Sequence, residues 1–170
     1  LRHEGHPDEN VHLVGNVMID TQRRMLPAAD ARNALERYGV DEGQYGLVTF
    51  HRPANVDSPE SLSQVVEVLK WAANRLRLLF PVHPRTQGRL EEFGLWESLA
   101  ETPDIELLPP VGYLDCLALS KSAKVVITDS GGLQEETTAL GVPCLTMRPN
   151  TERPVTTEYG TSTLVSNDPQ

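Results

Sequence analysis

The sequence predicts an α/β protein built on a doubly wound parallel sheet of the Rossmann-like type. Short runs of β-branched and apolar residues alternate with longer helix-compatible segments along most of the chain. This alternation is typical of parallel sheets that carry helices on both faces. A length of 170 residues suits one domain with a substantial core, so we expect residues 1–170 to form a single domain.

The strands are predicted where β-branched and apolar residues cluster between turn signals. The run Val-Val-Ile-Thr at 125–128 is the clearest of them, because it breaks at Asp129-Ser130-Gly131-Gly132. The others are shorter or less regular. In chain order, the expected strands are 11–14, 45–50, 78–82, 105–108, 125–128, 143–147 and 163–165.

The first two helices are placed by their start and stop signals. A helix is expected over residues 17–26, and Pro27 is expected to end it because proline lacks an N–H donor and clashes with the preceding turn. Asp30 can cap a second helix that runs to Tyr38, with Gly39 as its C-terminal signal.

The third helix has the strongest start signal in the chain. Asp57-Ser58-Pro59-Glu60 combines a cap residue, a first-turn proline and a first-turn acid, and apolar residues follow it at helical spacing up to Leu76. We expect Trp71, Trp96 and Tyr38 to contribute to packing. The remaining helices are expected at about 86–93 with 96–99 continuing it, at 113–121 and at 133–140.

The composition excludes several classes of partner. A net charge of −9 provides no basic surface for nucleic acid or an anionic membrane, and no run of eighteen apolar residues is present. Cys116 and Cys144 fit buried free thiols in a reducing cytoplasm. Because Leu1 is not methionine and residues 1–10 read as the tail of an earlier element, we expect a piece of a longer chain.

Polar residues gather at the ends of four predicted strands. The carboxyl edge of an open α/β sheet is where ligands bind, so these groups are expected to face one crevice and to favour a phosphate or nucleotide site. The groups are His51-Arg52, His83 with Arg85, Ser130-Gly131-Gly132, and the stretch from Arg148 to Arg153.

The turn Ser130-Gly131-Gly132 is the centre of this expected site. Two glycines allow close backbone approach, and the free N–H groups of the following helix favour an anion. Ser130 can cap the helix or donate to a phosphate oxygen, and Glu135 or Glu136 can reach a sugar hydroxyl. Taken alone, the same residues also make an ordinary loop, and the two acids can simply complement the helix dipole.

The other candidates have alternatives of their own. His51 and Arg52 suit a diphosphate or a leaving group, or His51 caps a loop. His83 lies between two prolines that could equally mark a rigid turn. Arg153 could reach a phosphate or be a surface charge, and Asp129 could fix its turn or touch substrate. Arg85 and Arg89 could both be solvated, and solvation is the interpretation we favour for Arg89.

The sequence does not contain a complete set of catalytic residues. It contains no nucleophile–base–orienter set, no metal cluster, no G-x-G-x-x-G motif and no Walker loop, so we expect neither a metal nor a cofactor. His3 and His6 form an H-x-x-H without further ligands and read as a solvated tail. The residues therefore indicate the part of a protein that binds the ligand, without the groups that would complete the catalysis.

Five motifs, in order, resemble the C-terminal half of the non-hydrolysing UDP-N-acetylglucosamine 2-epimerases. The resemblance covers essentially the whole chain. The motifs are Gly15-Asn16 with Val17-Met18-Ile19-Asp20, Thr49 to Asp57, Pro81 to Thr86, Thr128 to Glu136, and Thr151-Glu152-Arg153-Pro154.

The resemblance implies a GT-B-like fold in which UDP-sugar binds between two Rossmann-like halves. The family interconverts UDP-N-acetylglucosamine and UDP-N-acetylmannosamine by eliminating UDP to a 2-acetamidoglucal and adding it back. We expect the full-length protein to be a cytoplasmic homodimer that serves cell-surface polysaccharide biosynthesis.

The resemblance also implies roles for single residues. His51 would contact the diphosphate or assist at the leaving group, and Arg153 would help to hold the diphosphate. Ser130, Gly131 and Gly132 would bind phosphates, and Glu136 would bind the ribose hydroxyls. The stretch from Pro110 to Tyr113 would flank the uracil, and His83 would match a histidine of a regulatory site in some members.

Two departures from the family pattern limit this transfer. Pro53-Ala54 stands where many members have Arg-Glu, and the acids proposed to move the C2 proton lie mostly in an N-terminal half that the chain does not contain. The chain alone is expected to bind UDP weakly without turnover. The alternatives are half of a GT-B glycosyltransferase and a non-catalytic UDP-sugar-binding module.

Overall fold

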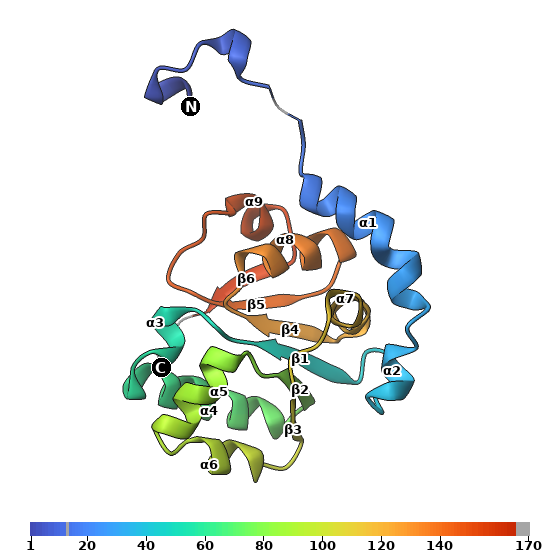
Figure 1. Cartoon of the computed structure of the whole chain (residues 1–170), viewed down its shortest axis with the longest axis vertical. Coiled ribbons are helices and arrows are strands. Elements are labelled where there is room, and N and C mark those ends of the chain that lie inside the picture. The colour runs from blue at the N-terminus through green and yellow to red at the C-terminus, as the bar shows by residue number, and fades with distance from the viewer. Residues whose placement is uncertain (13, 166–170) are drawn as a thin grey trace.

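A six-stranded, fully parallel sheet forms the centre of the molecule, as predicted (Figure 1). The computed structural model describes residues 1–12 and 14–165. The strand order is β3-β2-β1-β4-β5-β6, so the chain reverses its direction of winding between β1 and β4. The strands are β1 Tyr45–Thr49, β2 Arg77–Pro81, β3 Ile105–Leu108, β4 Val125–Thr128, β5 Cys144–Met147 and β6 Ser162–Val165.

Successive side chains of the central strands enter two separate cores. Leu47 belongs to one core and Val48 to the other, and Val126 and Ile127 divide in the same way. The central strands β1, β2 and β4 are buried on both faces, which explains why they read as continuous apolar runs and not as alternating ones.

Helices cover both faces, which makes the sheet doubly wound (Figure 1). Residues of α3 Pro53–Val56, α4 Pro59–Ala73, α5 Pro84–Glu92 and α6 Trp96–Ala100 complete the first core. Residues of α1 Val17–Asp30, α2 Ala34–Arg37 and α7 Tyr113–Ser122 complete the second. The other two helices are α8 Gly131–Leu140, which packs on α1 and α7, and α9 Pro154–Glu158.

The predicted start of α4 is confirmed in detail. Ser58 is the N-cap, its Oγ accepts a hydrogen bond from the Ser61 N–H at 3.1 Å, and Pro59 occupies the first turn.

The predicted end of α1 at Pro27 is wrong. The helix continues through Pro27 to Asp30, so Asp30 is its last residue, and α2 follows Asn33, which has a left-handed backbone. Pro27 lies in the final turn, where the missing N–H removes one helical hydrogen bond, and the packing of α1 on α7, which buries Ala29, favours the longer helix.

Three further expectations are corrected. Residues 86–93 and 96–99 belong to two helices, separated by Gly94 with a φ of +67°. Trp71 is 61% exposed with Arg75 stacked 3.8 Å from its ring centroid, whereas Trp96 and Tyr38 do pack against the cores. Of the run at 11–14, Leu13 lies outside the described residues and the other three form no strand.

The amino-terminal segment leads away from the sheet before α1 begins (Figure 1). It contains two short 3₁₀ turns, Arg2–Glu4 and Asp8–Asn10, and no buried residue in either. Within the described part of the chain, no helix is long and apolar enough to cross a membrane. Cys116 is half-buried, Cys144 is buried, and both are free thiols.

A nearly buried carboxylate ties α7 to α2 and to the connection that precedes α2. Asp115 is 6% exposed, and its two oxygens lie 2.8 Å from Arg32 Nε and 2.7 Å from Arg37 Nη2. Hydrogen bonds from Arg32 and then Arg37 hold the pKa of Asp115 well below its ordinary value. A carboxyl with a lowered pKa contributes stability above its unfolded pKa and loses it as the pH falls through the folded pKa.

We therefore expect Asp115→Asn to be less stable than the wild type at pH 7, with a difference that shrinks as the pH falls from about 5 towards 2. Urea denaturation at several pH values measures this. Asp30→Asn removes an exposed ion pair with Lys121 and serves as the control, with little expected effect. A difference for Asp115→Asn that stays constant with pH would contradict this account.

Candidate functional site

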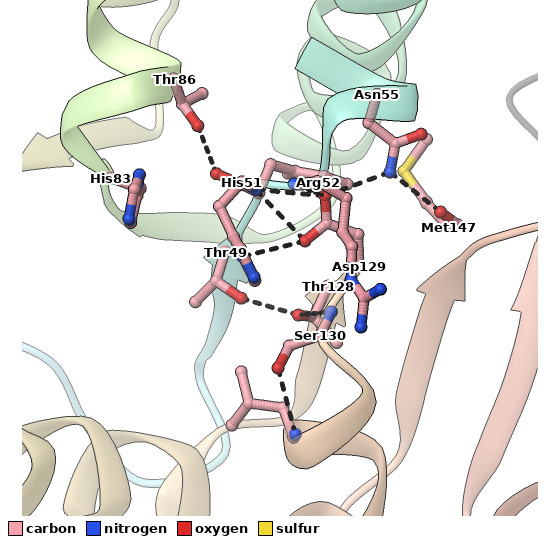
Figure 2. Close-up of polar contacts among 12 residues, drawn as sticks. Thr49, His51, Arg52, Asn55, His83, Thr86, Thr128, Asp129, Ser130 and Met147 are labelled. Carbon is pink, nitrogen blue, oxygen red and sulfur yellow. Dashed lines mark hydrogen bonds and ion pairs between the residues drawn. The ribbon is translucent and has the colours of Figure 1, made fainter. Parts of the chain in front are cut away.

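The four polar strand ends lie along the carboxyl edge of the sheet, as expected. The ends of β1 and β4 are neighbours at the point where the winding reverses, and they bring His51 and Arg52 beside Asp129 and Ser130 (Figure 2). In open α/β sheets this point opens a crevice for ligands.

Asp129 holds the turn after β1 against the end of β4. It is fully buried, and its carboxylate accepts hydrogen bonds from the backbone N–H groups of His51 and Arg52, the latter at 2.8 Å. It also accepts one from Asn55 Nδ2 at 3.2 Å (Figure 2). Burial raises the pKa of Asp129, but the bonds from His51, Arg52 and Asn55 outweigh it and lower the pKa below its ordinary value. One role considered for Asp129 is to fix its own turn, whereas its carboxylate fixes the turn after β1.

The same carboxylate orients the imidazole of His51. Nδ1 of His51 lies 3.2 Å from an Asp129 oxygen, and the ring is 41% exposed. A carboxylate at Nδ1 fixes the orientation of the ring and directs Nε2 away from Asp129, so that Nε2 can face a ligand.

His83 caps α5 beside this group. Its Nδ1 accepts a hydrogen bond from the Arg85 N–H at 3.1 Å, and its ring centroid lies 5.7 Å from that of His51. Arg85 forms a two-point ion pair with Asp57. Arg89 is only partly solvated, in contrast to the expectation. Its half-exposed side chain forms an ion pair with Glu92 and lies 3.6 Å from Asp57.

The turn after β4 combines a helix cap with a glycine pair. Helix α8 begins at Gly131, two residues earlier than predicted, because Ser130 is its N-cap and its Oγ accepts from the Leu133 N–H at 3.4 Å. The Ser130 N–H donates to Thr128 Oγ1, which pairs with Thr49 Oγ1 of β1 at 2.7 Å (Figure 2). An accepting Ser130 oxygen keeps its own proton for a ligand.

Arg153 and Glu135 form an ion pair on one side of this turn. Arg153 Nε lies 3.0 Å from one oxygen of Glu135, and Asn16, the N-cap of α1, donates to the other at 2.9 Å. Both oxygens of Glu135 therefore have protein partners, so its clearest structural role is to position Arg153.

Glu136 has a different environment from its neighbour. It is 9% exposed and accepts a hydrogen bond from the Tyr113 hydroxyl at 3.1 Å. Burial raises the pKa of Glu136, and burial followed by the Glu136 charge raises the pKa of Tyr113 to about 12. A hollow of about 270 Å³ lies next to them, lined by Val17, Met18, Thr21, Tyr113 and Glu136.

The sequence predicted no individual role for two charged residues of the site. Arg148 and Glu152, after β5, form an ion pair at 2.8 Å, and Arg52 lies 3.6 Å from the same carboxylate. Their four-residue spacing suggests a helical pair, whereas here it spans a loop. The role of α1 in lining the hollow through Val17 and Met18 was also not predicted, because it depends on tertiary packing.

The fold and the site together define a Rossmann-like α/β domain with arginine side chains beside its switch point. Within residues 1–12 and 14–165, no group of three His, Cys, Asp or Glu side chains is placed to hold a metal ion. The family model for UDP-N-acetylglucosamine 2-epimerase matches residues 1–170. The chain belongs to this family.

Individual relatives agree with this assignment. The chain is 40% identical to a UDP-N-acetylglucosamine 2-epimerase of Methanococcus maripaludis, covering 98% of this chain and 47% of that protein. A crystal structure of the Methanocaldococcus jannaschii UDP-GlcNAc 2-epimerase, in complex with UDP-GlcNAc and UDP, superposes with a TM-score of 0.89 at 40% identity. That match covers 98% of this chain and 47% of the other. The chain thus spans about half the length of the relatives it matches.

Proposed function

We propose that this chain is the UDP-binding, C-terminal half of a UDP-N-acetylglucosamine 2-epimerase, an isomerase with a GT-B-like fold of two halves. Family membership supports the activity, and the crystal structure of the similar Methanocaldococcus jannaschii enzyme contains UDP-GlcNAc and UDP. The observation that carries the proposal is the convergence of His51, Arg52, the start of α8 and Arg153 at the switch point.

The ligand would lie along this edge with its diphosphate over the first turn of α8. Ser130 and the N–H groups of Gly131 and Gly132 would bind phosphate oxygens, with Arg52 and Arg153 supplying positive charge. Glu136 would accept from the ribose hydroxyls, and the hollow beside Tyr113 would receive the nucleoside. Glu135 would act through Arg153, because both of its oxygens are engaged.

His51 would assist the departure of UDP. Loss of the diphosphate from C1 of the sugar develops negative charge on the departing UDP, and the His51 ring, oriented by Asp129, would lie beside that charge. The groups that move the C2 proton would come from the N-terminal half. A homodimer and a cytoplasmic location are part of the same proposal for the complete protein.

A deuterium-exchange experiment tests whether proton transfer at C2 requires the N-terminal half. The 170-residue chain in heavy water should leave the C2 proton of UDP-N-acetylglucosamine in place, whereas the complete protein should exchange it and form UDP-N-acetylmannosamine. Exchange by the chain alone would contradict the proposal. A product assay separates the alternatives, since a glycosyltransferase would move the sugar to an acceptor and a binding module would form no product.

A further inference from the structure

The carboxylate of Glu152 lies beside Gly131, the first residue of α8. A Cβ built on Gly131 would lie 3.0 Å from Glu152 Oε1, and 3.6 Å from a guanidinium nitrogen of both Arg148 and Arg52. Glu152 Oε2 is 2.8 Å from Arg148 Nη1, and Oε1 is 3.6 Å from Arg52 Nη2. We call Arg52, Arg148 and Glu152 the arginine–glutamate cluster.

This position is electrostatically the place for an anion. Free N–H groups at the start of a helix carry partial positive charge, and two guanidinium groups add to it. A hydrogen bond from its own backbone N–H, and then the charges of Arg148 and Arg52, lower the pKa of Glu152, so the group is ionised at neutral pH. The carboxylate therefore supplies the negative charge that a phosphate would otherwise supply.

Glu152 is also free to leave, unlike Glu135. The Glu152 side chain is 45% exposed and belongs to the loop after β5, so its rotation into water costs little more than its screened ion pairs. Glu135 is 14% exposed and held by Asn16 and Arg153. Arg148 differs again, because its side chain is only 15% exposed and stays beside Gly131 when its partner departs.

We propose that Glu152 occupies the phosphate position of the site in the unliganded protein, and that Arg148, with Arg52, passes from Glu152 to the distal phosphate of UDP when the ligand binds. This inference rests on the proposed function, because it assumes that UDP binds at this turn. It assigns a phosphate-binding role to Arg148 and makes Glu152 an internal competitor that weakens affinity for diphosphates.

Glu152→Gln tests the exchange, because it keeps the shape of the side chain and removes its charge. We expect it to tighten binding of UDP and of inorganic pyrophosphate about 3- to 10-fold and to leave uridine unchanged, as expected from the loss of one screened ion pair. Arg148→Gln should weaken UDP and pyrophosphate binding about 10-fold or more, again with uridine unchanged. NMR titration of the chain measures all three ligands.

Two further variants test whether the effect depends on the position of the charge and on the pairing of Glu152 with Arg148. Glu158→Gln makes the same charge change at the exposed end of α9 and should shift UDP affinity less than twofold, since exposed charges are screened by salt. In the Arg148→Gln background, Glu152→Gln should tighten UDP binding less than it does alone. Unchanged uridine affinity in each variant shows that the fold is intact.

The outcomes separate this inference from the proposed function. If UDP fails to bind the wild-type chain at this turn, the proposed function itself fails. If UDP binds there and Glu152→Gln weakens or does not alter its affinity, Glu152 instead holds the arginines for the ligand or has no part in binding, and the exchange is refuted.

Discussion

Asp129→Asn should lower the free energy of unfolding by about 3–5 kcal/mol and abolish measurable UDP binding, because it removes a buried charge that organises two strand ends. The carboxylate accepts from the backbone N–H groups of His51 and Arg52 and from Asn55. An amide in its place presents an NH₂ group to donors and leaves at least one of them without an acceptor in a fully buried position.

Urea denaturation and UDP titration of the same samples measure this effect. Asp104→Asn is the matched control, since it makes the same chemical change at an exposed residue with a φ of +61°, where asparagine is well tolerated. A loss of less than about 1 kcal/mol, with UDP binding retained, would show that Asp129 does not organise the site.

His51→Ala in the complete enzyme should reduce the rate of epimerisation about 100- to 1000-fold, the usual contribution of a positioned proton donor. KM for the UDP-sugar should change much less, because Arg153 and the start of α8 remain in place. The stability of the chain should also change little, since the ring is 41% exposed and its backbone N–H still bonds to Asp129.

Steady-state kinetics measures the rate and KM, and thermal denaturation of the same samples measures the stability. His6→Ala, in the amino-terminal segment, is the control and should leave the rate unchanged. A His51→Ala enzyme that keeps more than a third of the wild-type rate would remove His51 from the chemical step.

The parallel sheet was predictable because its central strands β1, β2 and β4 are almost wholly buried. Continuous apolar runs such as 125–128 are typical of such strands, and β3 and β4 have the predicted bounds. Helix ends were harder where tertiary packing overrides local preference. Pro27 is a strong local stop signal, yet α1 continues because Ala29 is buried against the second core.

The location of the site could be predicted from the sequence, whereas most of its side-chain contacts could not. The rule that ligands bind at the carboxyl edge brought together His51 and Ser130, which are far apart in sequence. No local signal distinguishes Asp129 as the acceptor for two distant N–H groups, or shows that Glu135 pairs with Arg153 while Glu136 bonds to Tyr113. These partners depend on the three-dimensional approach of α1, α7 and the loop after β5 to α8.

The central claim is that the switch point of this sheet binds the diphosphate of UDP, and NMR titration of the ¹⁵N-labelled chain with UDP tests it most directly. The predicted result is a saturable set of shifts centred on residues 130–136, with His51, Arg52 and Arg153 affected as well. Shifts that gather elsewhere on the domain, or no saturable shifts at millimolar UDP, would contradict it.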